Sequence, residues 1–360
     1  MYDPFGLVLM VNHACNLRCT YCYNGRKFNR CMPLGIALKA LDRAVRSLAA
    51  GGTLELGFFG GEPLLEAGLI RQVLHHARLR AASDGFQLAA YVTTNGTAAD
   101  PEADELLGDP GLAVSISVDG LPDIHDRHRR YADGLATSAD VLATCLALLE
   151  AGKPFTAVMT VRPDTVRELP ENLRFLRALG VKLVEPALDL WTAWTGADLD
   201  QLDRAIHESV VVWRQGLPEF GVSWFNEKLA ERAGVTPPPT ARCGFGKAEI
   251  AVAPSGRLYP CERLIGEDRP DQPLRLPGDV GDGDDFLETD APETGGAERC
   301  GLSCPCCNYV RTGSVKRPDA LLKRLDTACA HAVASVLERG ASGRLEIRAA
   351  REEGVTYVHA

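Results

Sequence analysis

The strongest constraint on the fold is the alternation of strand-like and helix-like segments between residues 6 and 187. Apolar runs rich in branched and aromatic residues alternate with stretches of helical periodicity. Such repeats predict a parallel sheet covered by helices, because parallel strands need a long crossover connection. We therefore expect an α/β fold whose strands form a partial (β/α)6 barrel. The predicted strands cover 6–11, 54–59, 87–93, 112–118, 155–161 and 181–187, and the predicted helices lie near 34–50, 66–83, 101–107, 138–151 and 167–179.

A polar or glycine-rich motif follows each of the first four predicted strands. Parallel strands carry ligand sites at their carboxyl ends, so motifs in these positions are expected to face one site. In chain order they are CNLRCTYC (15–22), GGEP (60–63), TTNGT (93–97) and SVDG (117–120). Together, these motifs indicate a functional site more strongly than any one of them does.

Cysteine content and charge limit the class of protein. The chain of 360 residues has 12 cysteines and a formal net charge of −9. It has no apolar run of about 18 residues that would cross a membrane, and its N-terminal sequence does not resemble a signal peptide. We expect a cytoplasmic protein whose reduced thiols serve metal or redox chemistry, with neither nucleic acid nor a membrane as partner.

The first cysteine motif has an unusual number of thiols for a metal site. Cys15, Cys19 and Cys22 follow the first predicted strand at the spacing C-x3-C-x2-C. A structural zinc ion needs four ligands, and an iron–sulfur cube has four iron corners. Three thiolates would leave one iron open to bind a small molecule that carries amine and carboxylate groups.

Through CNLRCTYC followed by GGEP, the chain resembles the radical S-adenosylmethionine (SAM) superfamily. The resemblance covers residues 1–190 and implies a TIM-like partial barrel with a 4Fe–4S cluster on Cys15, Cys19 and Cys22. In that family the open iron chelates SAM, and reductive cleavage gives a deoxyadenosyl radical that takes a hydrogen atom from the substrate. The resemblance also implies a reducing electron donor such as a flavodoxin or ferredoxin.

The same resemblance assigns contacts with SAM to residues near the strand ends. Tyr21 resembles the family aromatic residue that packs near the adenine. The GGEP stretch resembles the segment that binds the SAM amino group, where glycine allows close approach and Glu62 offers a carboxylate acceptor. Asn95 either shapes its turn beside SAM or shapes only that turn. The full set is Tyr21, Gly60, Gly61, Glu62, Pro63, Asn95, Ser117 and Arg130.

Within this set, Ser117 and Arg130 resemble the pair that holds the SAM carboxylate and ribose, since a guanidinium fork suits a carboxylate. The preceding His125 and Asp126 either order this loop, as in the family, or belong to a solvated charged loop. Alternatives to Arg130 are Arg127, Arg129 and Arg162.

A second group of cysteines lies in the C-terminal part. The first two flank a predicted hairpin with a turn at PSG (254–256), and CGLSCPCC (300–307) follows. This order resembles the SPASM extension of radical SAM enzymes and implies two auxiliary iron–sulfur clusters, expected to be 4Fe–4S, with zinc in one site as the alternative. The block is spaced C-x3-C-x-C-C, whereas the family pattern is C-x2-C-x5-C-x3-C. The implied ligands are Cys243, Cys261, Cys300, Cys304, Cys306, Cys307 and Cys329.

Seven thiols cannot supply four ligands to each of two clusters. Because neighbouring residues on extended backbone point in opposite directions, we expect Cys306 and Cys307 to serve different clusters. We also expect the inner cluster to have an open corner that binds a substrate thiolate. The predicted inner set is Cys243, Cys261 and Cys307, the outer set is Cys300, Cys304, Cys306 and Cys329, and Cys31 is a spare thiol.

Acidic residues add further candidates. Glu262 directly follows Cys261, and it matches in position an acidic residue proposed as the base of sulfatase-maturing relatives. The alternative for Glu262 is a surface carboxylate. Glu185 and Asp189 either face the substrate or lie at the surface.

We expect three segments along the chain. Residues 1–235 form the barrel and the helices that follow it, residues 236–340 form the auxiliary-cluster domain, and residues 341–360 form a hairpin or added strands. Within the second segment, residues 262–299 are rich in Asp, Glu, Gly and Pro and predict a long exposed acidic loop.

The resemblance implies an enzyme that modifies a peptide or protein. The leading hypothesis is a thioether or carbon–carbon crosslink in a ribosomally made peptide. Alternatives are formylglycine formation in a sulfatase, a small-molecule dehydrogenase and, from a different class, a non-enzymatic metal-binding scaffold. Because the first strand begins near residue 6, we expect a long leader peptide to be held by a separate protein or by the C-terminal part.

Overall fold

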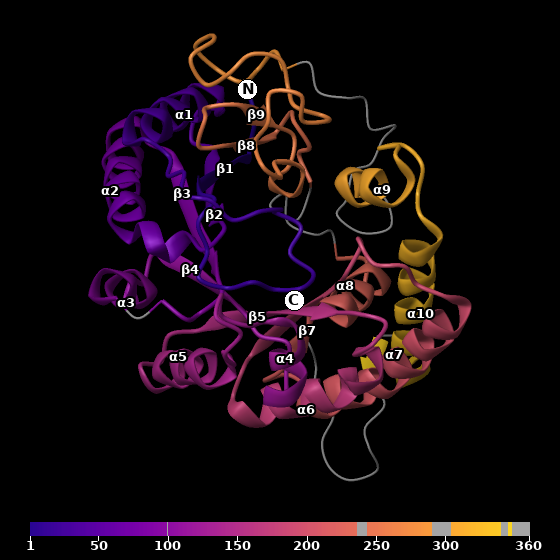
Figure 1. Ribbon diagram of the computed structural model, residues 1–360. Coiled ribbons are helices and arrows are strands. Elements are labelled where there is room, and N and C mark those ends of the chain that lie inside the picture. The colour runs from indigo at the N-terminus through magenta and orange to yellow at the C-terminus, as the bar shows by residue number, and fades with distance from the viewer. Residues whose placement is uncertain (99, 236–242, 290–303, 340–344, 348–360) are drawn as a thin grey trace.

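The computed structural model describes residues 1–98, 100–235, 243–289, 304–339 and 345–347. Its centre is a nine-stranded sheet in the order β7-β6-β5-β4-β3-β2-β1-β8-β9 (Figure 1). All neighbours in this sheet are parallel except β8 and β9. The strands are β1 (Phe5–Asn12), β2 (Thr53–Gly60), β3 (Gln87–Thr94), β4 (Leu112–Ser117), β5 (Phe155–Val161), β6 (Leu183–Leu188), β7 (Gly221–Val222), β8 (Glu249–Val252) and β9 (Leu258–Tyr259).

The predicted α/β fold with a parallel sheet is confirmed. Each predicted strand matches one of β1 to β6 within two residues, because fully buried strands such as β1, FGLVLMVN, are apolar along their whole length. The helices are α1 (Leu34–Ser47), α2 (Ala67–Asp84), α3 (Pro101–Gly108), α4 (Pro122–His128), α5 (Ser138–Glu150), α6 (Leu169–Leu179), α7 (Gly196–Gly216), α8 (Ser223–Arg232), α9 (Pro305–Thr312) and α10 (Ala320–Val336).

The strand order explains where the helices lie. Strands β1 to β6 are neighbours in chain order, and right-handed crossovers then place every connecting helix on the same side of the sheet. Figure 1 accordingly shows α1, α2, α3, α5 and α6 around the outside of the curved sheet. The opposite side and the carboxyl ends of the strands remain for the loops that carry the polar motifs.

The predicted hairpin at residues 243–261 is present, and it extends the main sheet. β8 and β9 pair antiparallel, and the turn between them contains Gly256 at φ +88°, a left-handed conformation that favours glycine. β8 also pairs in parallel with β1. The first residues of the C-terminal part are thus fixed beside the strand that carries the first cysteine motif.

The described part of the acidic segment, residues 262–289, is largely exposed or partly exposed, but a buried aromatic residue anchors it. Phe286 is fully buried, stacks on Phe5 at 5.8 Å between ring centroids, and lies 4.2 Å from the Arg43 guanidinium. Arg43 also donates to the Asp279 carbonyl at 2.8 Å, so a cation on α1 holds the segment through its backbone. Composition did not reveal this anchor, which depends on one aromatic residue. Residues 290–299 lie outside the described residues.

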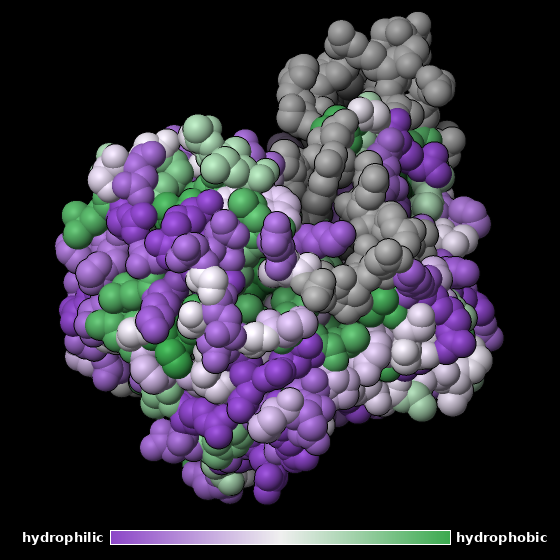
Figure 2. All heavy atoms as spheres, turned by 90° about the horizontal axis from the view of Figure 1, so that it is seen from above, coloured by the Kyte–Doolittle hydropathy of each residue, from purple (hydrophilic) through white to green (hydrophobic). Residues whose placement is uncertain are grey.

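The surface and the end of the chain show three further features. None of the described helices has the length and apolar character that crossing a bilayer requires. Apolar residues on the face shown in Figure 2 lie in patches separated by hydrophilic ones. The strands β10 (Leu337–Arg339) and β11 (Leu345–Ile347) pair antiparallel beyond α10.

Candidate functional site

All three cysteines of the first motif line one cavity at the carboxyl ends of the strands. Cys15, Cys19 and Cys22 are partly buried, and the empty space of about 1050 Å³ includes solvent at the mouth. Burial raises the pKa of Cys15 to about 11 and also raises the pKa of Cys19. A metal cation offsets the cost of forming thiolates in such surroundings, so this donor set suits metal binding.

The structure brings most of the predicted strand-end residues to this cavity. Asp189, from the end of β6, also lines it, which places that carboxylate at the site and not at the surface. Pro63 is buried at the start of the short helix η1 (Pro63–Glu66) and does not line the cavity. The predicted residues that do line it are Tyr21, Gly60, Gly61, Glu62, Asn95 and Ser117.

The Glu62 carboxylate already has three protein donors. It accepts hydrogen bonds from the Leu64 amide at 3.0 Å, the Thr94 hydroxyl at 2.7 Å and the Asn95 amide at 2.7 Å. Burial raises the pKa of Glu62, although these three bonds oppose the shift. The observed contacts therefore make Glu62 a tie between the ends of β2 and β3. Its predicted contact with a ligand ammonium stays a prediction.

The glycines of GGEP allow close approach to the cysteine loop. A Cβ atom on Gly61 would lie 2.1 Å from the Ala14 carbonyl oxygen, which real side chains do not tolerate. The Gly61 and Glu62 amides donate to the carbonyls of Asn12 and Ala14 at 3.0 and 2.8 Å. Small residues are needed here because the loop that begins at β1 lies directly against them.

Asn95 connects its turn to the first cysteine motif. Its side-chain amide donates to the Asn16 side chain at 2.9 Å and approaches the Cys15 sulfur at 3.8 Å. Its carbonyl oxygen accepts from the Thr97 amide at 2.9 Å. Asn95 thus both shapes the turn after β3 and faces the cysteine loop.

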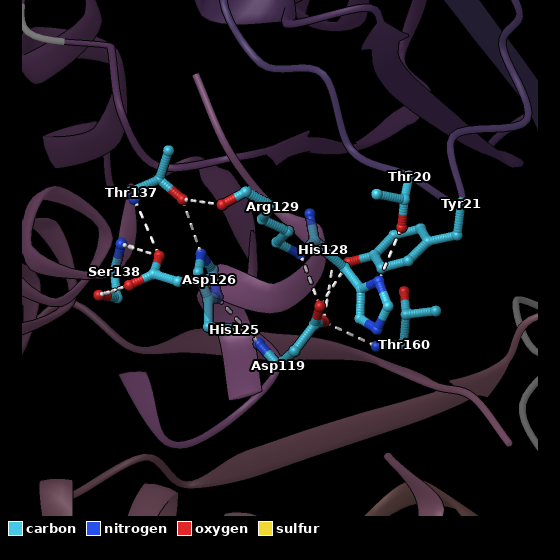
Figure 3. Close-up of polar contacts among 10 residues, drawn as sticks. All are labelled: Thr20, Tyr21, Asp119, His125, Asp126, His128, Arg129, Thr137, Ser138 and Thr160. Atoms are coloured by element: carbon cyan, nitrogen blue, oxygen red, sulfur yellow. Dashed lines mark hydrogen bonds and ion pairs between the residues drawn. The ribbon is translucent and has the colours of Figure 1, made fainter. Parts of the chain in front are cut away.

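A buried carboxylate, Asp119, fixes the second half of the cysteine loop (Figure 3). Asp119 accepts hydrogen bonds from Arg129 Nε at 3.0 Å, from the Thr160 amide at 2.9 Å and from the Tyr21 hydroxyl. Burial alone would raise the pKa of Asp119, but the Arg129 charge, with hydrogen bonds from Arg129 and Tyr21, holds it below its usual value. The carboxylate therefore stays ionised and connects the cysteine loop to the ends of β4 and β5.

Sequence reasoning quoted SVDG but did not single out Asp119. Two sequence features could have identified Asp119 as a site residue. It directly follows the predicted buried strand 112–118, and it precedes Arg129 by ten positions. Tyr21, assigned to the adenine by resemblance, has its hydroxyl on Asp119 and its ring 5.2 Å from the Arg129 guanidinium. Tyr21 therefore lines the cavity while its hydroxyl fixes the loop.

The structure places Arg129, and not Arg130, at the cavity. Arg130 is exposed and donates to the Gly134 carbonyl at 2.9 Å, whereas Arg129 is 6% exposed and lines the cavity. Residues 129 and 130 follow the end of α4 in extended backbone, so their side chains point in opposite directions. Sequence alone could not decide which of the two would face inward.

His125 and Asp126 order the loop after β4, as the resemblance implied. The Asp126 carboxylate accepts from the Thr137 and Ser138 amides at 2.9 and 3.0 Å. The buried His125 ring accepts at Nδ1 from the Asp119 amide at 3.2 Å, and burial lowers the pKa of His125 to about 4. A solvated charged loop does not describe these contacts.

Three parallel aromatic rings form one wall of the cavity. Tyr23 stacks on Phe59 and on Trp191, with centroid distances of 6.2 and 4.7 Å and interplanar angles of 8°. Trp191 is 45% exposed, so the stack extends from the cysteine loop towards solvent. Sequence reasoning did not identify this stack, since its three members come from distant parts of the chain.

The described C-terminal cysteines form a second group. The sulfurs of Cys304, Cys306 and Cys307 lie within 4.8 Å of one another and are buried. Cys261 contacts Cys306; this contact lowers the pKa of Cys261, but burial and neighbouring carboxylates raise it to about 12. Cys243 is partly buried, and Cys300 lies outside the described residues.

The reason for assigning Cys306 and Cys307 to different clusters is wrong. Both residues lie on helix α9, and their sulfurs are grouped with that of Cys304. Successive helical side chains are about 100° apart and not opposite, so two adjacent cysteines can face the same centre. The open auxiliary corner stays a prediction.

A second cavity, with an empty volume of about 850 Å³, lies beside this group. Cys307 from α9 and Cys329 from α10 line it, as does Glu185 at β6. Ala187, Leu188 and Arg263 line both cavities, so the two share a wall.

Two other sequence candidates lie apart from the first cavity. Glu262 is in the short helix η4 (Glu262–Leu264), and its carboxylate approaches the Cys261 sulfur at 3.4 Å without lining either cavity. Cys31 is exposed, and its sulfur contacts the Glu66 carboxylate at 2.7 Å. These positions agree with Cys31 as a spare thiol and place Glu262 beside the second cysteine group.

Comparison with known proteins finds similarity to one family over part of the chain. Residues 9–176 match the model of the Radical SAM superfamily. A protein of Methanocaldococcus jannaschii, MJ0907, is 32% identical over 178 residues, which cover 49% of this chain and 60% of that protein. The chain therefore spans about three fifths of the length of this relative.

Two further relatives have descriptive names. A PqqA peptide cyclase of Granulibacter bethesdensis is 27% identical, with 74% of this chain and 71% of that protein covered. A cysteine-type anaerobic sulfatase-maturating enzyme of Clostridium novyi is 22% identical, with 72% and 73% covered.

Solved structures share the fold. The structure of native anSMEcpe with bound AdoMet matches at a TM-score of 0.71 and 17% identity, covering 92% of this chain and 96% of that chain. The structure of Streptococcus suis SuiB bound to precursor peptide SuiA matches at a TM-score of 0.59 and 14% identity, covering 90% of this chain and 76% of that chain.

Proposed function

From the match of residues 9–176 to the Radical SAM superfamily, we propose that the protein modifies a peptide or protein substrate by radical chemistry. The observation that carries the proposal is the convergence of three thiols with the strand-end polar groups in one cavity. Two named relatives, a PqqA peptide cyclase and a sulfatase-maturating enzyme, support a polypeptide substrate.

The donor set fits the cofactors that this domain uses. Cys15, Cys19 and Cys22 would hold a 4Fe–4S cluster and leave one iron for SAM. When bound, the cluster and SAM supply a deoxyadenosyl radical that takes a hydrogen atom from the substrate. The Lys27 ammonium donates to the Cys22 sulfur at 2.9 Å and so contacts one of the three proposed ligands.

Protein groups around the cavity would orient SAM. Asp119 holds Arg129 at the cavity wall with two charge-assisted bonds, at 3.0 and 3.3 Å. A guanidinium fixed in this way is suited to a carboxylate. We assign the SAM carboxylate to Arg129 with Ser117, and the SAM amino group to the backbone of Gly60 and Gly61.

The C-terminal group would hold auxiliary iron–sulfur clusters. Soft thiolates are the ligands that iron–sulfur clusters and zinc share, and Cys261, Cys304, Cys306 and Cys307 are already gathered. The cavity wall shared with the first site supports a role in the same reaction. Cys243, Cys300 and Cys329 complete the proposed ligand set.

The leading reaction is a thioether or carbon–carbon crosslink in a ribosomally made peptide. The test is anaerobic incubation of reconstituted protein with SAM, a reductant and a peptide encoded beside its gene, followed by mass spectrometry. We expect deoxyadenosine and a peptide that lacks two hydrogen atoms, with one cysteine protected from alkylation if a thioether forms. A cysteine or serine converted to formylglycine would support sulfatase maturation instead.

The Cys31→Ala variant is the matched control, because this thiol lies outside the cavity. It should give the same product as the unaltered protein. A colourless protein that binds zinc and does not cleave SAM would contradict the proposal and favour a metal-binding scaffold.

A further inference from the structure

Arg263 lies between the radical SAM cavity and the second cysteine group. Of the three described residues that line both cavities, it alone is charged. It follows Cys261 by two positions on η4, and its Nη1 atom donates to the Cys307 sulfur at 3.4 Å. The guanidinium therefore contacts a sulfur on α9 while its side chain borders the cavity of the Cys15 loop.

Arg263 is partly buried, and its guanidinium stays protonated, so this position favours nearby groups that carry negative charge. Among the described residues, no carboxylate pairs with Arg263 within the distance of a salt bridge. The described contact of the guanidinium is with the Cys307 sulfur, so sulfur is the group placed to balance the cation.

Neutral thiols balance a cation poorly, whereas thiolates bound to a metal centre carry negative charge. Hydrogen bonds to cluster sulfurs and nearby charges are among the features that set the potential of an iron–sulfur centre. A cation beside such a centre favours the state with one additional electron, because that state carries one more negative charge. The charge of Arg263 would therefore change the reduction potential of a centre bound here, which can be measured.

We propose that Arg263 is a positioning residue that raises the reduction potential of an iron–sulfur cluster bound through Cys307 and its neighbours. This inference rests on the proposed auxiliary cluster. The couple concerned takes up one electron and no proton. The Arg263 side chain also borders the first cavity, so the same charge would lie between a cluster held by this group and the Cys15 loop.

The test uses full-length protein in which Cys15, Cys19 and Cys22 are replaced by Ala, so that only auxiliary clusters contribute. After anaerobic reconstitution, a redox titration is followed by electron paramagnetic resonance. We expect Arg263→Gln to lower the ratio of reduced to oxidised cluster about tenfold at a fixed potential, which is about 59 mV for one electron. Arg263→Lys, which keeps the charge, should recover most of this loss.

Arg311 provides the matched control. It lies on α9 with Cys307, but its guanidinium donates to the carbonyls of Leu190 and Thr192 at 3.1 and 2.9 Å and not to sulfur. Arg311→Gln should change the ratio less than about twofold, since it leaves the sulfur contact intact. If the Arg263→Gln protein takes up no iron, Arg263→Met provides a second neutral variant.

Three outcomes would overturn the inference. An unchanged potential in an iron-replete neutral variant would exclude a role for the charge. Weakened binding of the substrate peptide with an unchanged potential would assign Arg263 to the substrate. Absence of iron from the triple-alanine parent would reject the auxiliary cluster as well, while deoxyadenosine production by the unaltered protein would show that the radical SAM function stands.

Discussion

The two cysteine groups differ in how the chain assembles them. Cys15, Cys19 and Cys22 lie within eight residues on one loop and are partly buried around an open cavity. Cys261 comes from the β8–β9 hairpin region and meets Cys306 on α9, and both are buried. The first group is a local motif on a rigid sheet, whereas the second exists only after distant segments pack.

This difference teaches which features of a metal site sequence spacing can reveal. In the loop after β1, spacing and position at a strand end already indicate three ligands of one centre. In the C-terminal part, spacing misled, because Cys306 and Cys307 lie on a helix and not on extended backbone. Ligand sets assembled from several segments need the tertiary structure.

The largest expected effect comes from removing the first group. Replacing Cys15, Cys19 and Cys22 together by Ala should abolish deoxyadenosine production and lower the iron content by about four atoms per chain. The reason is that these thiols would be the protein ligands of the SAM-binding cluster. Chromatography of the nucleoside products and iron analysis measure both effects. Deoxyadenosine formation at the unaltered rate would refute the proposed role of the loop.

The second group should affect a different step. Replacing Cys304, Cys306 and Cys307 by Ala should lower the iron content and abolish peptide modification. Deoxyadenosine production should change only about twofold if the two sites act independently. The product peptide, deoxyadenosine and iron are measured on the same samples. If SAM cleavage is lost together with peptide modification, the two groups form one functional unit and the comparison drawn above fails.

A smaller effect is expected from the network that supports the first group. Asp119→Asn should leave the buried Arg129 guanidinium without its anionic partner and cost about 3–5 kcal/mol of unfolding free energy. Denaturant unfolding of the metal-free protein measures this loss. Asp123→Asn is the matched control, because its carboxylate is 72% exposed and 3.5 Å from Arg127, a pair worth less than about 1 kcal/mol. Equal costs for the two variants would show that the network does not stabilise the loop.

Much of the barrel was predictable because its signals are periodic and local. The apolar runs of β1 to β6 and the helical periodicity between them gave their positions closely. The order of motifs at strand ends also predicted that the Cys15 loop, Gly60 and Asn95 would meet. By contrast, the short helix α4 has seven residues and too few turns to show a period.

Sequence alone therefore determined the parallel α/β sheet, the cysteine loop after β1 and the strand ends that face it. Tertiary structure decided that Arg129 and not Arg130 reaches the cavity, that Phe286 anchors the acidic segment, and that Arg263 lies between the two sites. The physical reason is the range of the constraint. Periodicity and spacing act over a few residues, whereas side-chain direction after a helix end and contacts between distant segments are set by the packing of the whole core.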